Sequence, residues 1–103
     1  MPYRNIHQYW VYMMANRHRN VLYTGVTNDL YRRYLEHRED NVKGFTKRYN
    51  CCDLLYFEEY KLVEQAIARE KEIKGWRRSK KEQLIDTINP ERKNLAEEFG
   101  WNE

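Results

Sequence analysis

Residues 9–26, YWVYMMANRHRNVLYTGV, decide the fold of this 103-residue chain. Both ends of the stretch, Tyr9–Met14 and Val21–Val26, are short runs rich in β-branched and aromatic residues, which favour β-strands. The residues between them, ANRHRN, are polar and suit a turn. The pattern therefore predicts a β-hairpin.

Beyond the hairpin, helical and strand patterns alternate. Thr27-Asn28-Asp29 supplies cap residues for a helix that begins at Leu30 and ends at His37 or Arg38. The run DLLYFEEY, residues 53–60, predicts a third strand. Further helical segments are expected at residues 45–49, at Leu62–Lys74, from a Ser79 cap to about Ile88, and for one or two turns within residues 91–99.

The resulting order of elements, β-β-α-β-α-α, predicts an α+β fold in which helices flank a small three-stranded antiparallel sheet. A chain of 103 residues is long enough for one hydrophobic core and too short for two. We therefore expect a single domain over residues 1–103, with its core at about residues 8–95.

Charge is unevenly distributed along the chain. The net charge of +3 is too small to identify a nucleic-acid-binding protein. Residues 69–81, however, hold seven basic and two acidic side chains, whereas residues 82–103 hold six acidic and two basic ones. The basic run fits contact with phosphates, although such runs are more often solvated helix faces.

The two cysteines, Cys51 and Cys52, are neighbours and cannot form a disulfide framework or a zinc site of ordinary spacing. They indicate a reducing compartment. The sequence shows no secretory signal and no apolar run long enough to span a bilayer, so we expect a soluble, cytoplasmic protein without membrane contact.

Two charged residues fall on helix faces that should pack against the sheet. Leu30, Arg33, Tyr34 and His37 share one face by helical spacing, while Arg32 points away. An inward guanidinium needs partners, and an anion bound at the sheet surface would provide them. The alternative is that Arg33 extends to solvent or pairs with an internal acid.

Glu70 repeats this pattern with the opposite sign. It lies within the apolar stripe formed by Val63, Ala66, Ile67 and Ile73. A carboxylate at such a position either pairs with a cation, for which Lys74 is available one turn later, or binds a hard divalent metal ion. Together, Arg33 and Glu70 predict a site that hydrolyses a phosphodiester, with two strand tyrosines completing it.

These motifs resemble the GIY-YIG nucleases, a family that includes the amino-terminal domain of a bacterial excinuclease. Trp10-Val11-Tyr12 corresponds to the first signature triplet and Tyr23-Thr24-Gly25 to the second. TNDLYRRYLEH, residues 27–37, and EQAIAREKEIKGW, residues 64–76, follow in the family's order. Trp10 and Thr24 depart from the named glycine and isoleucine, and Val26 stands where the excinuclease domain has a lysine.

The resemblance implies a divalent-metal-dependent endonuclease that cuts DNA, with a role in repair or recombination. Arg33 matches the catalytic arginine, Glu70 matches the ligand of a single Mg²⁺ or Mn²⁺ ion, and His37 closes the first helical motif. Tyr12 and Tyr23 are both credible as the general base. The family's late asparagine corresponds to Asn89 or Asn94.

Contacts with nucleic acid are expected from exposed basic side chains, which would act on affinity rather than on the chemical step. The residues are Lys47, Arg48, Arg77, Arg78, Lys80 and Lys81. DNA, structured or damaged, is the expected partner, and RNA is not excluded. The alternatives are a nucleic-acid-binding module with the nuclease fold but little catalysis, and a protein-interaction domain in which Arg33 and Glu70 pair internally.

Overall fold

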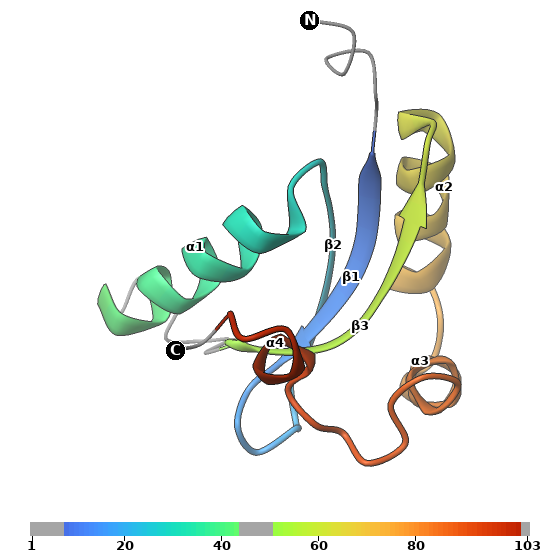
Figure 1. The fold of residues 1–103 in the computed structure, drawn as a ribbon. Helices are drawn as coiled ribbons and strands as arrows, with labels where there is room; N and C mark the ends of the chain where they lie inside the picture. The colour runs from blue at the N-terminus through green and yellow to red at the C-terminus, as the bar shows by residue number, and fades with distance from the viewer. Residues whose placement is uncertain (1–7, 44–50, 102–103) are drawn as a thin grey trace, which may run out of the picture.

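The computed structural model describes residues 8–43 and 51–101, which form a three-stranded antiparallel sheet covered by helices on both faces (Figure 1). Its strands are β1 (Tyr9–Ala15), β2 (Leu22–Thr27) and β3 (Asp53–Tyr60), in the spatial order β2-β1-β3. The predicted α+β fold is confirmed, and the strand bounds differ from the predicted ones by at most one residue.

Within these two ranges, four helices pack on the sheet: α1 (Leu30–Lys43), α2 (Val63–Lys74), α3 (Arg78–Asp86) and α4 (Leu95–Glu98). Leu30 and Leu95 pack with Tyr12 and Met14, so α1 and α4 cover one face. The other face carries α2 and α3, whose Ala66, Ile73 and Ile85 pack with Val11 and Met13. The sheet therefore has helices on both faces (Figure 1), and one hydrophobic cluster lies on each face.

The helix bounds differ from the sequence-based expectation chiefly at the end of α1 and in α3, which ends at Asp86 instead of about Ile88. Helix α1 continues to Lys43, beyond the expected end at His37 or Arg38, because no helix-breaking residue precedes Gly44. Helix α3 begins at Arg78 rather than after a Ser79 cap. The extended backbone of Arg77 places its carbonyl to accept the N–H groups of Lys80 and Lys81, so Arg77 takes the cap position and the helix starts two residues earlier than expected. The helical turn expected at residues 45–49 lies outside the described residues.

Strand register determines which side chains face α1. Tyr12 pairs with Gly25 on β2 and with Phe57 on β3, whereas its neighbour Met13 pairs with Thr24 and Tyr56. A register shift between Met13 and Met14 leaves one additional residue on β3, as in a β-bulge. Side chains from all three strands thus converge below α1.

On the opposite face, a closed polar group anchors α2 to β3; we call Tyr56, Glu58, Tyr60 and Arg69 the Glu58 cluster. The tyrosine hydroxyls donate to the two Glu58 carboxylate oxygens, each at 2.5 Å. Arg69 donates through Nε at 2.9 Å and through Nη2 at 3.2 Å. Its guanidinium also lies 5.0 Å from the centre of the Trp76 ring. Four donors therefore satisfy one half-buried carboxylate.

The helices of this fold are short or polar. Among residues 8–43 and 51–101, no helix combines the length and the apolar character needed to cross a membrane.

Candidate active site

Four of the predicted site residues meet between the sheet and α1; we call Tyr12, Tyr23, Arg33 and His37 the Tyr12 cluster. Tyr12 comes from β1 and Tyr23 from β2, where Tyr23 pairs with Met14 of the α1 face. Arg33 and His37 lie one turn apart on α1. The period of two in the strands and the helical period in α1 therefore place all four side chains in one layer.

Contacts within the Tyr12 cluster centre on the Tyr12 hydroxyl. Arg33 Nε donates to Tyr12 Oη at 3.1 Å, and Tyr12 Oη lies 3.4 Å from His37 Nε2. The Tyr23 ring meets the His37 ring edge-on, with centroids 5.0 Å apart. Helix packing and aromatic contacts thus fix the guanidinium beside two phenols.

Gly25 makes this arrangement possible. A Cβ atom at this position would lie 2.5 Å from Tyr12 Oη and 2.9 Å from Tyr23 Cε1, both shorter than any normal contact. Since both tyrosines are held by other contacts, a larger residue would displace them. In the sequence, Gly25 stood out only as the last residue of the second signature triplet. Its role in accommodating the two rings depends on the pairing of β1 with β2, which the sequence does not show.

Burial distinguishes the two tyrosines. Tyr12 is 1% exposed, and this burial raises the pKa of its phenol well above the ordinary value, although the Arg33 charge opposes the rise. Tyr23 is only partly buried.

Arg33 keeps its charge although it is partly buried. Burial alone would lower its pKa, but contacts with Tyr12, Tyr23 and Glu36 hold the pKa above the ordinary value. The cluster therefore combines a permanent cation with a neutral buried phenol.

Glu70 lies on α2, across the sheet from the Tyr12 cluster. Its side chain is 14% exposed, and one carboxylate oxygen lies 2.6 Å from Lys74 Nζ. The sequence left two alternatives for Glu70, an ion pair with Lys74 and binding of a divalent metal ion. The structure contains the ion pair. The apolar stripe around it was predicted only in part correctly, because Ala66 and Ile73 are buried but Ile67 is 39% exposed.

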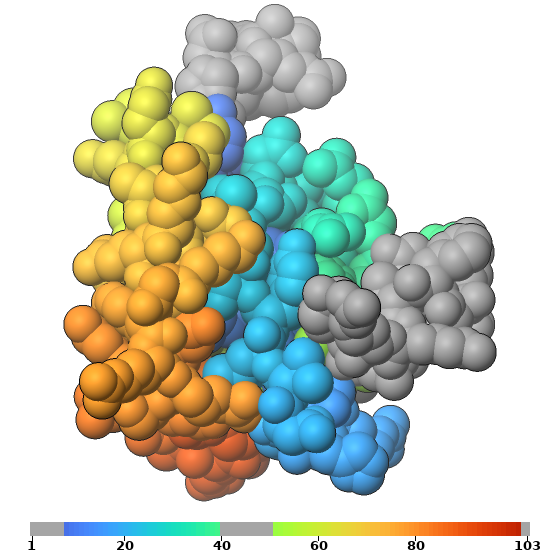
Figure 2. Space-filling view, turned by 180° about the vertical axis from the view of Figure 1, so that it is seen from behind, coloured from blue at the N-terminus to red at the C-terminus, as the bar shows by residue number. Residues whose placement is uncertain are grey.

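A hollow of about 360 Å³ connects the two helices around the edge strand β2. Arg32, next to Arg33, lines it from α1, and Ile67, one turn before Glu70, lines it from α2. Figure 2 shows β2 between the two helices on this side of the molecule. Arg33 and Glu70 therefore lie on opposite faces of the sheet, and neither lines this hollow, which their helix neighbours Arg32 and Ile67 do. Arg32 itself is 59% exposed, as its helical phase predicts.

The carboxylate oxygens of Glu70 fit a metal site in which the protein supplies few ligands. Among residues 8–43 and 51–101, no three His, Cys, Asp or Glu side chains gather closely enough to enclose a metal ion. Mg²⁺ is commonly bound by one or two carboxylates, with water and substrate phosphate completing its shell. The Glu70 carboxylate fits that role, provided that the ion replaces the Lys74 ammonium.

The basic residues expected to contact nucleic acid fall into different settings. Arg78 is tied to the β1–β2 turn, because it donates to the carbonyls of Arg19 and Asn20 and pairs with Glu82. Lys80 lies over the Trp76 ring at 4.3 Å. Arg77 is exposed and Lys81 is partly buried. Lys47 and Arg48 lie outside the described residues.

Both candidate asparagines have structural roles. Asn89, 4% exposed, donates to the Leu55 carbonyl and accepts from the Lys93 N–H. Asn94 caps α4 through Ala96 and accepts from the Leu54 N–H, and its amide donates to the Tyr34 hydroxyl at 3.3 Å. Asn94 thus contacts α1, the helix that carries Arg33 and His37.

Comparison with known proteins identifies the class. Residues 8–83 match the model of the GIY-YIG catalytic domain, and the chain belongs to this family of nucleases. The family implies a nucleic-acid substrate.

Several relatives carry the name UPF0213. A UPF0213 protein of Haloquadratum walsbyi is 38% identical over 65 residues, which cover 63% of this chain and 73% of that protein. One from Vibrio parahaemolyticus is 32% identical over 82 residues, covering 80% of this chain and 77% of that protein. The solution NMR structure of a UPF0213 protein from Bacillus halodurans has the same fold, with a TM-score of 0.53 and 24% identity over 87% of this chain and 95% of that chain.

Proposed function

We propose that this protein is a divalent-metal-dependent endonuclease that hydrolyses phosphodiester bonds in DNA. The observation that carries the proposal is the centre of the Tyr12 cluster, where Arg33 Nε donates to the phenol of Tyr12 and not to a buried carboxylate. Its acidic partner, Glu36, lies on its own helix and is 48% exposed. Such an exposed pair contributes little, so a phosphate can replace Glu36 at small cost.

Each residue of the cluster has a role in phosphoryl transfer. Arg33 would bind the scissile phosphate and balance the charge that develops on it in the transition state. Tyr23, the more accessible phenol, would position the attacking water and accept its proton while its own phenolic proton passes to the neighbouring His37 ring. Tyr12, kept neutral by burial, would hold Arg33 and donate a hydrogen bond to His37 or to the phosphate. His37 would orient the hydroxyls.

Glu70 would hold Mg²⁺ or Mn²⁺ through its carboxylate, and the ion would supply polarisation of the phosphate and stabilisation of the leaving oxygen. Lys74 then becomes a competitor, because its ammonium occupies the same carboxylate at 2.6 Å. A role in repair or recombination is part of the same proposal, and it rests on the resemblance to the excinuclease domain.

The test is incubation of the purified protein with duplex, single-stranded, flapped and branched DNA, and with RNA, in Mg²⁺ or Mn²⁺. We expect cleavage that Glu70→Gln abolishes and that Arg32→Ala preserves. Lys74→Met should lower the metal concentration needed for half-maximal rate, since it removes the competing cation. Cleavage by Glu70→Gln at the wild-type rate would refute the metal site.

A second candidate function is a nucleic-acid-binding module without catalysis, and the Glu70–Lys74 pair favours it. Binding of DNA without cleavage of any of these substrates, in either metal, would support this alternative over the nuclease.

A further inference from the structure

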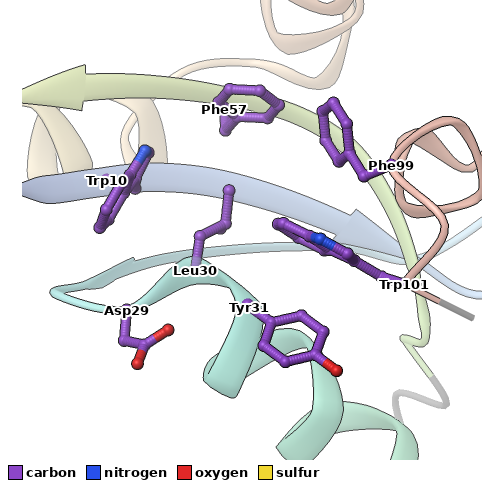
Figure 3. A pocket seen from close by; sticks show the side chains of 7 residues that line it. All are labelled: Trp10, Asp29, Leu30, Tyr31, Phe57, Phe99 and Trp101. Carbon is purple, nitrogen blue, oxygen red and sulfur yellow. The ribbon is translucent and has the colours of Figure 1, made fainter.

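An aromatic pocket lies beside the Tyr12 cluster on the α1 face of the sheet. Its volume is about 460 Å³, and five of the seven lining residues are aromatic. The lining residues are Trp10, Asp29, Leu30, Tyr31, Phe57, Phe99 and Trp101. In Figure 3, Leu30 lies between the two tryptophans, with the phenylalanines along one side and the start of α1 along the other.

The pocket walls hold one another in place while their faces stay accessible. Trp101 packs against Tyr31 at 5.1 Å and against Phe99 at 4.9 Å between ring centroids, and Phe57 lies 5.9 Å from Phe99. Tyr31 is nevertheless 47% exposed and Phe99 46% exposed. Large exposed rings gathered in one place mark a binding surface rather than a core.

The charge of the pocket selects its ligand. Of the seven lining residues, only Asp29 is charged, and a carboxylate repels a phosphate. Asp29 Oδ1 accepts the backbone N–H of Arg32 at 3.0 Å, which fixes the carboxylate at the start of α1. A carboxylate can accept several hydrogen bonds, so Asp29 can also receive an amino group. The pocket therefore fits an uncharged planar ring that carries an N–H donor.

Chain connectivity places the pocket about one nucleotide from the phosphate site. Trp10 and Tyr12 are two residues apart on the same face of β1, a separation of about 7 Å along a strand. Leu30, which also lines the pocket, precedes Arg33 by three residues and shares its face of α1. A strand whose phosphate contacts Arg33 would thus bring a neighbouring base to the rings.

We propose that this pocket binds an unstacked nucleobase that carries an exocyclic amino group, which excludes thymine and uracil, adjacent to the phosphate held by Arg33. The exocyclic amino group donates to Asp29 while the ring stacks on the aromatic side chains. Because a base inside a duplex is paired and stacked, the preferred substrate has an unpaired nucleotide beside the cleavage position, as in a flap or a branch. The inference rests on the proposed function, of which it specifies the substrate.

The first experiment measures binding without metal, so that it does not depend on cleavage. Short single-stranded oligomers of dA, dC and dT, and an abasic oligomer of equal length, are titrated while tryptophan fluorescence is recorded. Two of the three tryptophans line the pocket, so base stacking should quench the signal. We expect dA and dC to bind more tightly than dT, and the abasic oligomer to bind most weakly.

Variants then test the pocket walls. Tyr31→Ala and Phe99→Ala should each weaken binding of the dC oligomer by about 5- to 100-fold, the loss typical of one stacking contact. Leu35→Ala is the matched control, because Leu35 is a 36% exposed apolar residue one turn later on the same helix and does not line the pocket. Asp29→Asn, which keeps a helix-capping residue, should reduce the preference for dC over dT.

The outcomes separate the two proposals. If the protein cuts no substrate but the dC oligomer binds in the expected order, the pocket stands and the nuclease function fails. If it cuts DNA but Tyr31→Ala and Phe99→Ala bind and cut as the wild type does, the pocket proposal is wrong and the nuclease stands. Equal affinity for the abasic oligomer would also overturn it, as would self-association through these rings that DNA fails to disrupt.

Discussion

The Tyr12 cluster and the Glu58 cluster are built from similar parts on opposite faces of one sheet. Each joins strand tyrosines to an arginine from the covering helix. Each arginine also pairs with a glutamate three residues later on its own helix, Arg33 with Glu36 at 3.1 Å and Arg69 with Glu72 at 3.0 Å. These local pairs therefore do not explain why one cluster anchors a helix while the other is the proposed catalytic site.

The difference lies in the atom that each arginine Nε meets. Arg69 Nε donates to the carboxylate of Glu58, whose side chain is 17% exposed and which also accepts from two tyrosines. Arg33 Nε donates to the neutral phenol of Tyr12. A guanidinium balanced by an internal carboxylate stabilises the fold, whereas one held by phenols is available to an external anion.

The largest expected effect is on catalysis by Arg33→Ala. Loss of a preorganised charge-stabilising donor typically costs a factor on the order of 10²–10³ in rate, about 3–4 kcal/mol of barrier. Single-turnover cleavage should fall by at least this factor, while urea denaturation shows little change in stability. Arg69→Ala should give the reverse pattern. An Arg33→Ala variant that unfolds easily but cuts normally would show that the two clusters have the same role.

The next effect concerns Gly25→Ala, because the new methyl group would collide with Tyr12 and Tyr23. Moving two held side chains costs typically about 1–3 kcal/mol, and the Arg33 contact would be lost with them. Both cleavage rate and unfolding free energy should therefore fall. Gly75→Ala is the matched control, since its Cβ would lie 3.5 Å from the nearest atom with φ at −82°. Equal effects of the two substitutions would contradict the close packing at Gly25.

Removing the anchor on the other face should act on stability. Arg69→Ala leaves Glu58 without its cation, and we expect a loss of about 2 kcal/mol, less than for a fully buried pair because Arg69 is 23% exposed. Arg32→Ala, which removes a 59% exposed arginine on α1, should change stability by less than about 0.5 kcal/mol. Chemical denaturation of the two variants checks the contrast.

Much of the fold could be predicted from the sequence, because strand and helix periods act locally. The DLLYFEEY run predicted β3 to the residue, and the placing of Leu30, Tyr34 and His37 on one face of α1 is confirmed by their burial. The length of α1 was underestimated. The helix contains no glycine or proline to mark its end, so its end depends on tertiary packing, which the local sequence does not show.

The site could be predicted less completely. Helical phase shows that Glu70 points toward the sheet, but it does not tell which face of the sheet the helix covers, and α2 covers the face opposite α1. The aromatic pocket was missed altogether. Its rings come from β1, α1, β3 and the end of α4, so no local pattern joins Trp10 to Trp101.

The smallest expected effect is the pH dependence of stability that Glu58 contributes. Burial alone would raise the pKa of this carboxyl, but hydrogen bonds from Arg69, Tyr56 and Tyr60 outweigh burial and lower it. A folded-state pKa below the unfolded one adds stability above the ordinary value of 4.5, and this stability is lost as the pH falls through the folded-state pKa.

Thermal unfolding measured from neutral to acid pH should therefore show a shallower loss for Glu58→Gln than for the wild type. Glu36→Gln is the corresponding change at the Tyr12 cluster, and at neutral pH it should lower stability less than Glu58→Gln, because the Arg33–Glu36 pair is exposed and local. If Glu36→Gln destabilised the protein as much as Glu58→Gln does, then Glu36 would be the internal counter-ion of Arg33. The Tyr12 cluster would then be as closed as the Glu58 cluster, and the case for a phosphate there would fail.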